Sequence, residues 1–330
     1  CGRNAGFELG TFTGWQGDTG DVLNLLPPNV VLTTPGIYSN LGYWSSNHIV
    51  TSGTQTDVNT CYTVPTVCPY GGPNSARLGN TNIYCHAEDL YYTYRVDVNN
   101  PILVYAFAPV LQDPNHPDYA QPAFVSYVKD SLGNILPCTY YRVTATNLRG
   151  QSLCNDQFAN VRVYRNWKNV AVDLSAYAGQ NVTVYFQTSD CAFCGHYGYA
   201  YLDIIGCYPK QIDINRCGQD SMVTLTAPPG FDSYIWSTGQ RTQSITLNVN
   251  TVTTVSCTYT SVTGCSLTMT VNRRAFDPIV NFSAPPVCVC DNLATTFTDL
   301  TMQNQPVVAW KWDFGDLSLQ STLQNPTHQY

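Results

Sequence analysis

The amino-acid sequence predicts an all-β protein made of consecutive β-sandwiches. Charged residues make up only 11% of the 330 residues, less than half of their usual share of about a quarter. Glutamate occurs at positions 8 and 88 alone, and lysine is nearly as rare, although these residues normally cover the exposed faces of helices. Threonine, valine and tyrosine, which favour strands, are abundant. This composition excludes a helix-rich protein.

Residues 1–208 predict the first and largest domain. They contain short segments in which apolar and polar residues alternate, at 90–98, 102–111, 123–130, 170–174 and 182–188. Turn-forming segments such as GGPN, SLGN and YAGQ separate them. This spacing predicts a two-sheet antiparallel sandwich of jelly-roll size.

Residues 209–274 predict a second, smaller sandwich of the immunoglobulin-like type. Its expected strands lie at 221–227, 233–238, 244–249, 253–260 and 266–272. Trp236 falls in a central strand, where a large aromatic side chain commonly anchors the core of such a domain.

Residues 275–330 predict a third sandwich that is incomplete. Segments 295–301 and 307–316 are expected to form strands or strand-turns, and 325–330 a turn that enters another strand. Because a sandwich this short would leave an unpaired edge, we expect the natural polypeptide to continue beyond Tyr330.

The charge and the hydropathy pattern exclude several classes of partner. The net charge of −7 and the pI near 5.0 argue against nucleic acid, because few cations are present to neutralise phosphates. No stretch approaches eighteen consecutive apolar residues, so no membrane span is expected. The opening residues CGRNAGFE are turn-like and do not form a signal peptide, which predicts a mature product or a fragment.

The fourteen cysteines predict disulfide bonds and therefore an extracellular or cell-surface location. A zinc or thioredoxin-like site is less favoured, because the CxxC pair at Cys191 and Cys194 lacks a second cluster and a following helix. The connectivity cannot be derived from sequence. Near neighbours in the sequence give the simplest candidate pairs, Cys61 with Cys68 and Cys138 with Cys154. Cys217 and Cys265 bracket most of the second domain and form a third candidate pair. Cys191 and Cys207 are further candidates for disulfide bonds.

No catalytic motif is present, so no enzyme activity is predicted. The DFGD segment at 313–316 lacks the other parts of a kinase and is interpreted as a turn. His116 and His196 have no nucleophile partner close in sequence, and both are interpreted as hydrogen-bonded structural residues.

Three segments resemble modules of extracellular proteins. Residues 310–330, WKWDFGDLSLQSTLQNPTHQY, resemble the PKD domain, although Leu317 replaces the usual glycine after the second aspartate and predicts a remodelled turn. YIWSTGQRTQSITLNV, at 234–249, is similar to the Ig-like repeats of Bacteroidota surface proteins. NAGFELGTFTGWQGDTG, at 4–20, and DCAFCGHYGYAYLD, at 190–203, resemble a sandwich domain of large gliding-motility adhesins and other type 9-secreted proteins of that phylum.

The resemblance to jelly-roll carbohydrate-binding modules also implies a calcium site. In those sandwiches calcium joins the first strand to the last, and the matching residues here are Glu8 and Asp203, with Asn4 as a further oxygen donor. Calcium takes six to eight oxygen ligands, so backbone carbonyls would have to complete the site. The alternative is that Glu8 caps a turn and Asp203 faces solvent.

Exposed aromatic side chains are the other candidate binding residues. Trp15, Trp44 and Trp167 lie near turn signals, where their rings could stack on sugars, although most aromatic residues of such domains form the core.

These features together predict a non-catalytic, extracellular adhesin or filament-forming segment that contacts surface glycans or neighbouring subunits, including copies of itself. The alternative is a carbohydrate-binding accessory region of a secreted hydrolase.

Overall fold

The structure, a computed structural model, describes residues 1–22, 30–37, 47–149, 153–155, 161–216, 222–248, 254–275, 280–285, 294–302 and 307–330. Regular structure in these ranges is almost entirely β-strand, which confirms the predicted all-β fold. Single helical turns occur at Val58–Thr60, Asp118–Ala120, Ala145–Leu148 (α1) and Ser175–Tyr177. Among the described residues, no helix has the length and apolar character needed to cross a bilayer.

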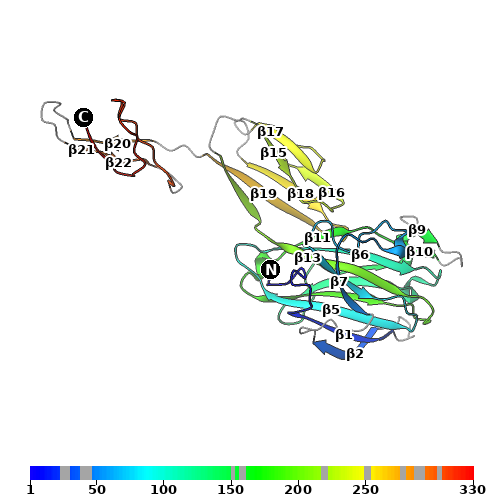
Figure 1. Cartoon of the computed structure of the whole chain (residues 1–330). Helices are drawn as coiled ribbons and strands as arrows, with labels where there is room; N and C mark the ends of the chain where they lie inside the picture. The colour runs from blue at the N-terminus through cyan, green and yellow to red at the C-terminus, as the bar shows by residue number, and fades with distance from the viewer. Residues whose placement is uncertain are drawn as a thin grey trace. The chain divides into compact units, whose positions relative to one another are not determined.

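Two antiparallel sheets form the first sandwich (Figure 1). The six-stranded sheet has the order β2-β1-β5-β12-β7-β8, with strands Val30–Ile37, Trp15–Val22, His86–Arg95, Asn181–Ser189, Ala123–Lys129 and Tyr141–Thr144. The other sheet has the order β3-β4-β13-β6-β10-β9, with strands His48–Ser52, Asn74–Gly79, Gly198–Tyr208, Ile102–Gln112, Val161–Tyr164 and Leu153–Asn155. β11, Lys168–Asp173, pairs with the first half of β6, on the edge of β6 that also pairs with β10.

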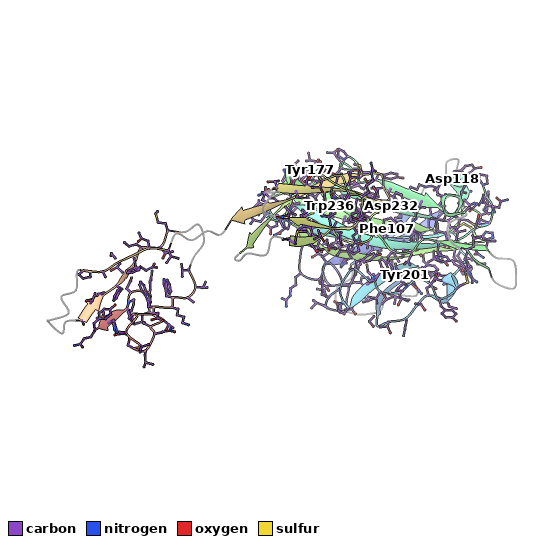
Figure 2. All side chains as sticks on the ribbon, turned by 90° about the horizontal axis from the view of Figure 1, so that it is seen from above. Phe107, Asp118, Tyr177, Tyr201, Asp232 and Trp236 are labelled. Atoms are coloured by element: carbon purple, nitrogen blue, oxygen red, sulfur yellow. A yellow bond between two sulfur atoms is a disulfide. The ribbon has the colours of Figure 1, made fainter. Side chains whose placement is uncertain are left out.

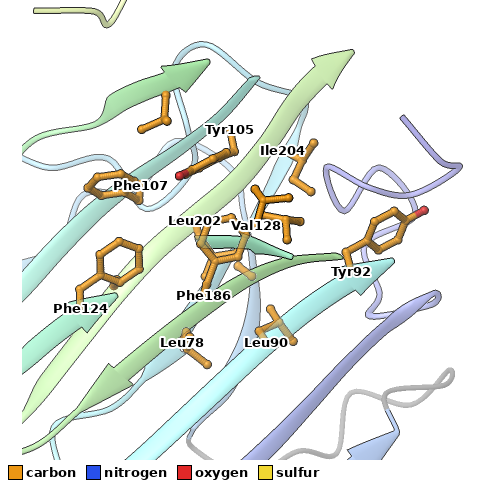
Figure 3. Close-up of a cluster of buried hydrophobic side chains, with 14 of the residues drawn as sticks. Leu78, Leu90, Tyr92, Tyr105, Phe107, Phe124, Val128, Phe186, Leu202 and Ile204 are labelled. Atoms are coloured by element: carbon orange, nitrogen blue, oxygen red, sulfur yellow. The ribbon is translucent and has the colours of Figure 1, made fainter. Parts of the chain in front are cut away.

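The core of this sandwich follows from the two-residue period of its strands. In β12, Val182, Val184 and Phe186 point inward, and the residues between them point outward. Figure 3 shows such side chains from both sheets meeting between the layers, among them Leu90, Phe107, Phe124, Phe186 and Leu202. Burial of one such side chain contributes about 1.5–3 kcal/mol.

Strand β6 is buried along its whole length, because both of its faces are covered. Leu103, Tyr105 and Phe107 pack in the core between the sheets. Ala106 and Ala108 point to the other side, into a second apolar cluster. A strand buried on both faces has an almost continuous apolar sequence, as ILVYAFAPVL does.

The second apolar cluster lies beneath residues 53–73, here called the covering loop, which join β3 to β4. Val64 and Cys68 of this loop pack against Tyr199 and Tyr201 of β13. The carboxylate of Asp57 accepts hydrogen bonds from the Tyr199 hydroxyl at 2.7 Å and from the Tyr201 hydroxyl at 3.0 Å. The loop therefore satisfies the polar ends of the tyrosines that it buries.

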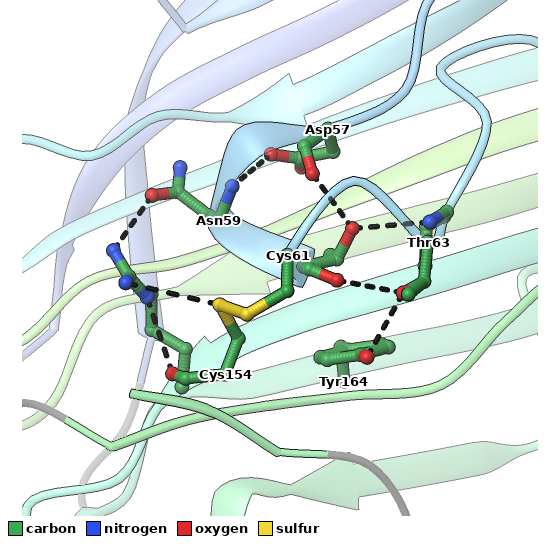
Figure 4. The surroundings of a disulfide bond; sticks show 9 residues. Asp57, Asn59, Cys61, Thr63, Cys154 and Tyr164 are labelled. Atoms are coloured by element: carbon green, nitrogen blue, oxygen red, sulfur yellow. Dashed lines mark hydrogen bonds between the residues drawn. A yellow bond between two sulfur atoms is a disulfide. The ribbon is translucent and has the colours of Figure 1, made fainter. Parts of the chain in front are cut away.

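A disulfide bond between Cys61 and Cys154 fastens the covering loop to β9 (Figure 4). Beside it, the hydroxyl of Thr63 donates to the Tyr164 hydroxyl at 2.9 Å. Asn59 accepts a hydrogen bond from the Arg162 guanidinium at 3.0 Å. Side-chain contacts at both ends of the sulfur bridge thus hold the loop on the sheet.

The disulfide connectivity corrects the candidate pairs. The four bonds are Cys1–Cys207, Cys61–Cys154, Cys85–Cys194 and Cys138–Cys265. The pairs of Cys61 with Cys68, Cys138 with Cys154 and Cys217 with Cys265 were therefore wrong. The bonds join cysteines that the sheet topology brings together from distant positions, which proximity in sequence does not show. Cys68, Cys191 and Cys257 are buried free thiols, and Cys217 lies outside the described residues.

The second sandwich contains the sheet β14-β19-β18-β16 and the pair β15-β17. Their bounds are Gln211–Arg216, Ser266–Ala275, Thr254–Thr260, Ser233–Trp236, Met222–Thr226 and Ser244–Asn248. Trp236, labelled in Figure 2, is buried and its Nε1 donates to the carbonyl of Thr242 at 2.8 Å, as predicted for a core anchor. The expected central strand was wrong, because β16 lies at the edge of this four-stranded sheet.

Several bonds join this sandwich to the first one. The disulfide Cys138–Cys265 links them covalently. Lys168 forms an ion pair of 2.7 Å with Asp232, and the backbone N–H of Asn169 donates to the carbonyl of Gly230 at 2.9 Å.

By its internal contacts the chain divides into two compact units, one of residues 1–212, 224–246 and 255–270, and one of residues 213–223, 247–254 and 271–330. The division into domains at 208/209 and 274/275 stays a prediction.

The last segment has little regular structure. It contains Phe282–Ser283 (β20) paired with Thr298–Asp299 (β22), and Ala294–Thr296 (β21) paired with Thr327–Gln329 (β23). Of the strand or strand-turn expected at 307–316, the structure has a bridge between Trp312 and Ser321 followed by bends, and no continuous strand. A cluster of aromatic rings provides the packing there instead, from Phe282, Phe297, Trp312 and Phe314. Leu317, which stands where the PKD domain usually has glycine, has the left-handed backbone conformation that glycine favours, with φ of 66°.

Candidate functional site

The outward face of the six-stranded sheet contains a row of four tyrosines. Tyr91 of β5 lies opposite Tyr185 of β12, which lies opposite Tyr127 of β7. The ring centroids are 5.0 Å and 4.9 Å apart, and Tyr140 continues the row at 6.3 Å from Tyr127. We call these four residues the tyrosine row. Tyr91, Tyr127 and Tyr185 are half-buried and Tyr140 is 54% exposed.

The rings of the row overlap rather than lie flat on the sheet. Neighbouring ring planes are within 24° of parallel at about the spacing of adjacent strands. Rings so arranged form an offset stack. The stack turns ring edges and phenol hydroxyls outward and leaves a ring face free only at its ends, so it offers apolar surface together with hydrogen-bonding groups.

Charged and polar groups border the tyrosine row. The ammonium of Lys129 lies 4.8 Å from the ring centre of Tyr185 and 5.3 Å from that of Tyr127, which is within cation–π range. Gln187, two residues along β12, lies opposite Asp89 of β5. Burial raises the pKa of Asp89 to about 7, although the Asp18 backbone N–H donates to its carboxylate at 2.8 Å. The face thus combines aromatic rings with donors and acceptors.

The predicted tryptophan platform was wrong at two of its three positions. Trp15 is 1% exposed and stacks on Phe7 with ring centroids 4.6 Å apart. Trp167 is 2% exposed beneath the covering loop, where its Nε1 donates to the carbonyl of Pro65 at 2.8 Å. Both rings contribute to packing instead of facing solvent. Trp44 lies outside the described residues.

The sequence did contain a signal for the tyrosine row. Leu90, Val128 and Val184 alternate with Tyr91, Tyr127 and Tyr185, so the period of two assigns the tyrosines to the outward face. What the sequence lacked was the register that places the three tyrosines side by side on adjacent strands.

Two of the three calcium candidates lie together around Gly6. A Cβ atom at this glycine would lie 3.0 Å from a carboxylate oxygen of Asp203, 3.0 Å from one of Glu8 and 2.6 Å from the carbonyl oxygen of Ile204. Asp203 is fully buried, which excludes the alternative that it faces solvent. The other part of that alternative is confirmed, because the exposed Glu8 caps its turn by accepting the Gly6 backbone N–H at 3.2 Å. The Oδ2 of Asp203 accepts from Ser75 at 3.0 Å, but its Oδ1 is buried with no hydrogen-bond partner among the described residues.

The charge state of Asp203 depends on this environment. Burial raises its pKa to about 8, and the nearby negative charge of Glu8 adds to the effect. A bound cation would offset the desolvation of the Asp203 carboxylate. The arrangement therefore fits a hard cation at Glu8 and Asp203, with the Ile204 carbonyl as a third oxygen.

Asn4 has a different role from the predicted one. Its Oδ1 accepts from the backbone N–H of Leu9 at 2.8 Å, and its Nδ2 donates to the carbonyls of Thr11 and Thr13. Its amide therefore holds the N-terminal loop together, and its oxygen is already engaged.

No family model and no curated protein matches the chain. Among solved structures, the chain is similar to TmCBM61 in complex with β-1,4-galactotriose, at 12% identity over 61% of this chain and 96% of that one, with a TM-score of 0.30. It is also similar to CBM28, a carbohydrate-binding module specific for non-crystalline cellulose, at 13% identity over 63% and 94%, with a TM-score of 0.31. A third similarity is to the K2 cleaved adhesin domain of Lys-gingipain, at 16% identity over 49% and 82%, with a TM-score of 0.27.

Proposed function

We propose that the chain is a non-catalytic, extracellular binding segment that holds glycan chains on the outward face of its six-stranded sheet. The observation on which this rests is the tyrosine row, which is aligned across three neighbouring strands. Stacking between the strands stabilises the sheet, but it also leaves four aromatic side chains in one line on a face that solvent reaches. Aromatic rings bordered by a few polar groups are typical of sites that bind sugars.

The polar groups beside the row suit a ligand rich in hydroxyls. Lys129 and the phenol hydroxyls can donate hydrogen bonds to sugar oxygens, and the Gln187 amide can both donate and accept. The four disulfide bonds fit an oxidising compartment, where glycans of cell surfaces are present.

We further propose that the segment belongs to a large Bacteroidota surface adhesin of the gliding-motility and type 9-secretion class. Support comes from the quoted motifs and from the covalent link between its first two sandwiches.

Neighbouring copies of the chain are the second class of partner that we propose, besides surface glycans. An accessory region of a secreted hydrolase remains the alternative. Regular fibres of the purified protein in electron micrographs would favour the adhesin, whereas monodisperse particles with tight binding to one polysaccharide would favour the accessory region.

Binding to a glycan array tests the tyrosine row directly. Tyr185→Ala removes the central ring and should weaken binding to the preferred glycan by at least tenfold. The matched control is Tyr62→Ala, an exposed tyrosine on the covering loop of the other sheet, which should leave binding unchanged. Equal binding by the two variants, or no glycan bound by the parent protein, would contradict the proposal.

Calcium is proposed as a bound structural ion at Glu8 and Asp203. Titration calorimetry with Ca²⁺ should show heat that Glu8→Gln and Asp203→Asn each abolish, whereas Asp313→Asn, in an exposed turn, keeps it. Heat that neither substitution changes would remove both residues from the list of ligands.

A further inference from the structure

Two loops bring a thiol and two imidazoles together at one end of the first sandwich. His116 lies in the loop between β6 and β7, and Cys191 and His196 lie in the loop between β12 and β13. The Cys191 sulfur and one ring nitrogen of each histidine all lie within 4.8 Å of one another. The two histidines are 80 positions apart in the sequence, so their separate interpretation as structural residues overlooked the cluster.

The spacing of these atoms matches a metal site. The Cys191 sulfur lies 3.5 Å from Nδ1 of His196. Zinc bonds of about 2.3 Å to sulfur and about 2.0 Å to nitrogen, at a tetrahedral angle, place those two atoms about 3.5 Å apart. The His116 nitrogen lies no more than 4.8 Å from both atoms, so it needs to move by at most about 1.5 Å to reach the spacing that zinc bonds impose.

The cysteine is available as a ligand. Cys191 is buried and takes part in no disulfide bond. The backbone N–H of Gly195 points at its sulfur at 3.4 Å, and such a donor stabilises a thiolate. Nδ1 of His116 is buried and has no hydrogen-bond partner among the described residues, so one imidazole nitrogen is free to coordinate.

The backbone around the cluster is held in place before any ion binds. The disulfide Cys85–Cys194 fixes the loop that contains Cys191. Within this loop, the N–H of Cys191 donates to the carbonyl of His196 at 2.9 Å. The N–H of Ala192 donates to the carbonyl of Ala120 at 3.1 Å and ties the two loops to each other. Preorganised ligands lose little entropy on binding.

We propose that His116, Cys191 and His196 form a binding site for a transition-metal cation of the Zn²⁺ or Cu⁺ type, with one coordination position left for water or an external ligand. Thiolate and imidazole donors select these ions over hard ions such as Ca²⁺. Binding replaces the proton of the Cys191 thiol with the metal and releases that proton to solvent. This site is separate from the tyrosine row and from the carboxylates around Gly6.

Titration of the chelator-treated full chain, with its disulfides oxidised, tests the site. Zn²⁺ should bind at one ion per chain, and Co²⁺ should give the charge-transfer absorption of a thiolate–cobalt bond. Zn²⁺ should also slow alkylation of Cys191, identified by mass spectrometry, by at least tenfold. Each of His116→Gln, His196→Gln and Cys191→Ser should weaken Zn²⁺ binding by at least tenfold. Cys257→Ser, which removes another buried free thiol, should bind as the parent does.

The outcomes separate the site from a simple S–H···N hydrogen bond between Cys191 and His196. Binding of Cu⁺ in place of Zn²⁺, with the same dependence on the three residues, supports the proposal and assigns the ion. Absence of the cobalt–thiolate band together with no retained Zn²⁺ or Cu⁺ overturns it. Because His116 is only half-buried, His116→Gln should fold as the parent does, and unchanged affinity in that folded variant also overturns it.

Discussion

The two sheets of the first sandwich have similar tyrosines on their outward faces, but a loop among the described residues covers only one of these faces. On the six-stranded sheet, Tyr91, Tyr127 and Tyr185 are half-buried. On the other sheet, Tyr199 and Tyr201 of β13 occupy outward positions with the same period of two, yet they are buried beneath the covering loop. The alternation of residues is the same on both sheets. The difference lies in a loop that is distant in sequence from the tyrosines that it buries.

Covering changes what a tyrosine does. Beneath the loop, the hydroxyls of Tyr199 and Tyr201 donate to Asp57, and burial strongly raises the pKa of both phenols. Such a hydroxyl contributes to stability and is not available to a ligand. On the open face, the hydroxyls of the tyrosine row remain available for binding. Substitutions on the covered face should therefore change stability, and substitutions on the open face should change binding.

The largest expected effect comes from releasing the covering loop. Replacing both Cys61 and Cys154 by serine removes a cross-link between residues 93 positions apart, and chain entropy predicts a loss of about 4.5 kcal/mol in unfolding free energy. Urea unfolding measures this loss, and binding to the preferred glycan should not change. A loss below about 1 kcal/mol would show that the loop stays in place without its disulfide bond.

Glu88, between the two sheets, should give the next largest effect through pH. Burial raises its pKa to about 8, and Asp190 adds to the effect, whereas the pKa in the unfolded chain is about 4.3. The folded protein therefore keeps a proton that the unfolded chain loses, so this contribution is full below about pH 4 and is lost as the pH rises to about 8.

Urea unfolding of the parent and of Glu88→Gln across this range should show the effect. The parent should lose stability relative to the variant by a few kcal/mol as the pH rises. A constant difference between the two proteins from pH 4 to pH 8 would show that Glu88 ionises normally in the fold.

Asp57→Ala should have an effect of about 2 kcal/mol on stability. It removes the acceptor of two buried hydroxyls and of the Asn59 backbone N–H, and a buried donor without a partner costs about 1–3 kcal/mol. The thermal midpoint should fall, with glycan binding at low temperature unchanged. A variant as stable as the parent would mean that water replaces the carboxylate and that the loop does not seal this face.

The smallest effects come from a matched pair that removes one hydroxyl from each face. Tyr201→Phe should cost about 1 kcal/mol of stability because its hydroxyl bonds Asp57. Tyr185→Phe should cost less than about 0.5 kcal/mol, as is usual for a partly exposed position, but should weaken glycan binding measured by calorimetry. The reverse pattern would exchange the roles assigned to the two faces.

The strands of the sandwich were predictable because each one shows its period locally. Segments 90–98, 102–111 and 182–188 correspond to β5, β6 and β12 within a few residues. The site was not predictable to the same degree. Tryptophan is the usual choice for a sugar platform, but Trp15 and Trp167 are core residues, and the aligned tyrosines depend on strand register. The disulfide bonds also depend on topology, because Cys1 pairs with Cys207 across almost the whole first domain.

The bond between Cys1 and Cys207 also determines how mechanical tension passes through the protein. A pull that enters at Cys1 and leaves toward the later residues crosses directly to Cys207 through sulfur, at the far end of β13. From this bond the force reaches the Cys138–Cys265 bond by three routes in parallel, residues 2–137, 139–206 and 208–264. The four rings of the tyrosine row lie on the two longer routes, and the shortest route limits how far these can be extended. The backbone beneath the aromatic face would therefore carry only a share of the tension when the later residues are pulled.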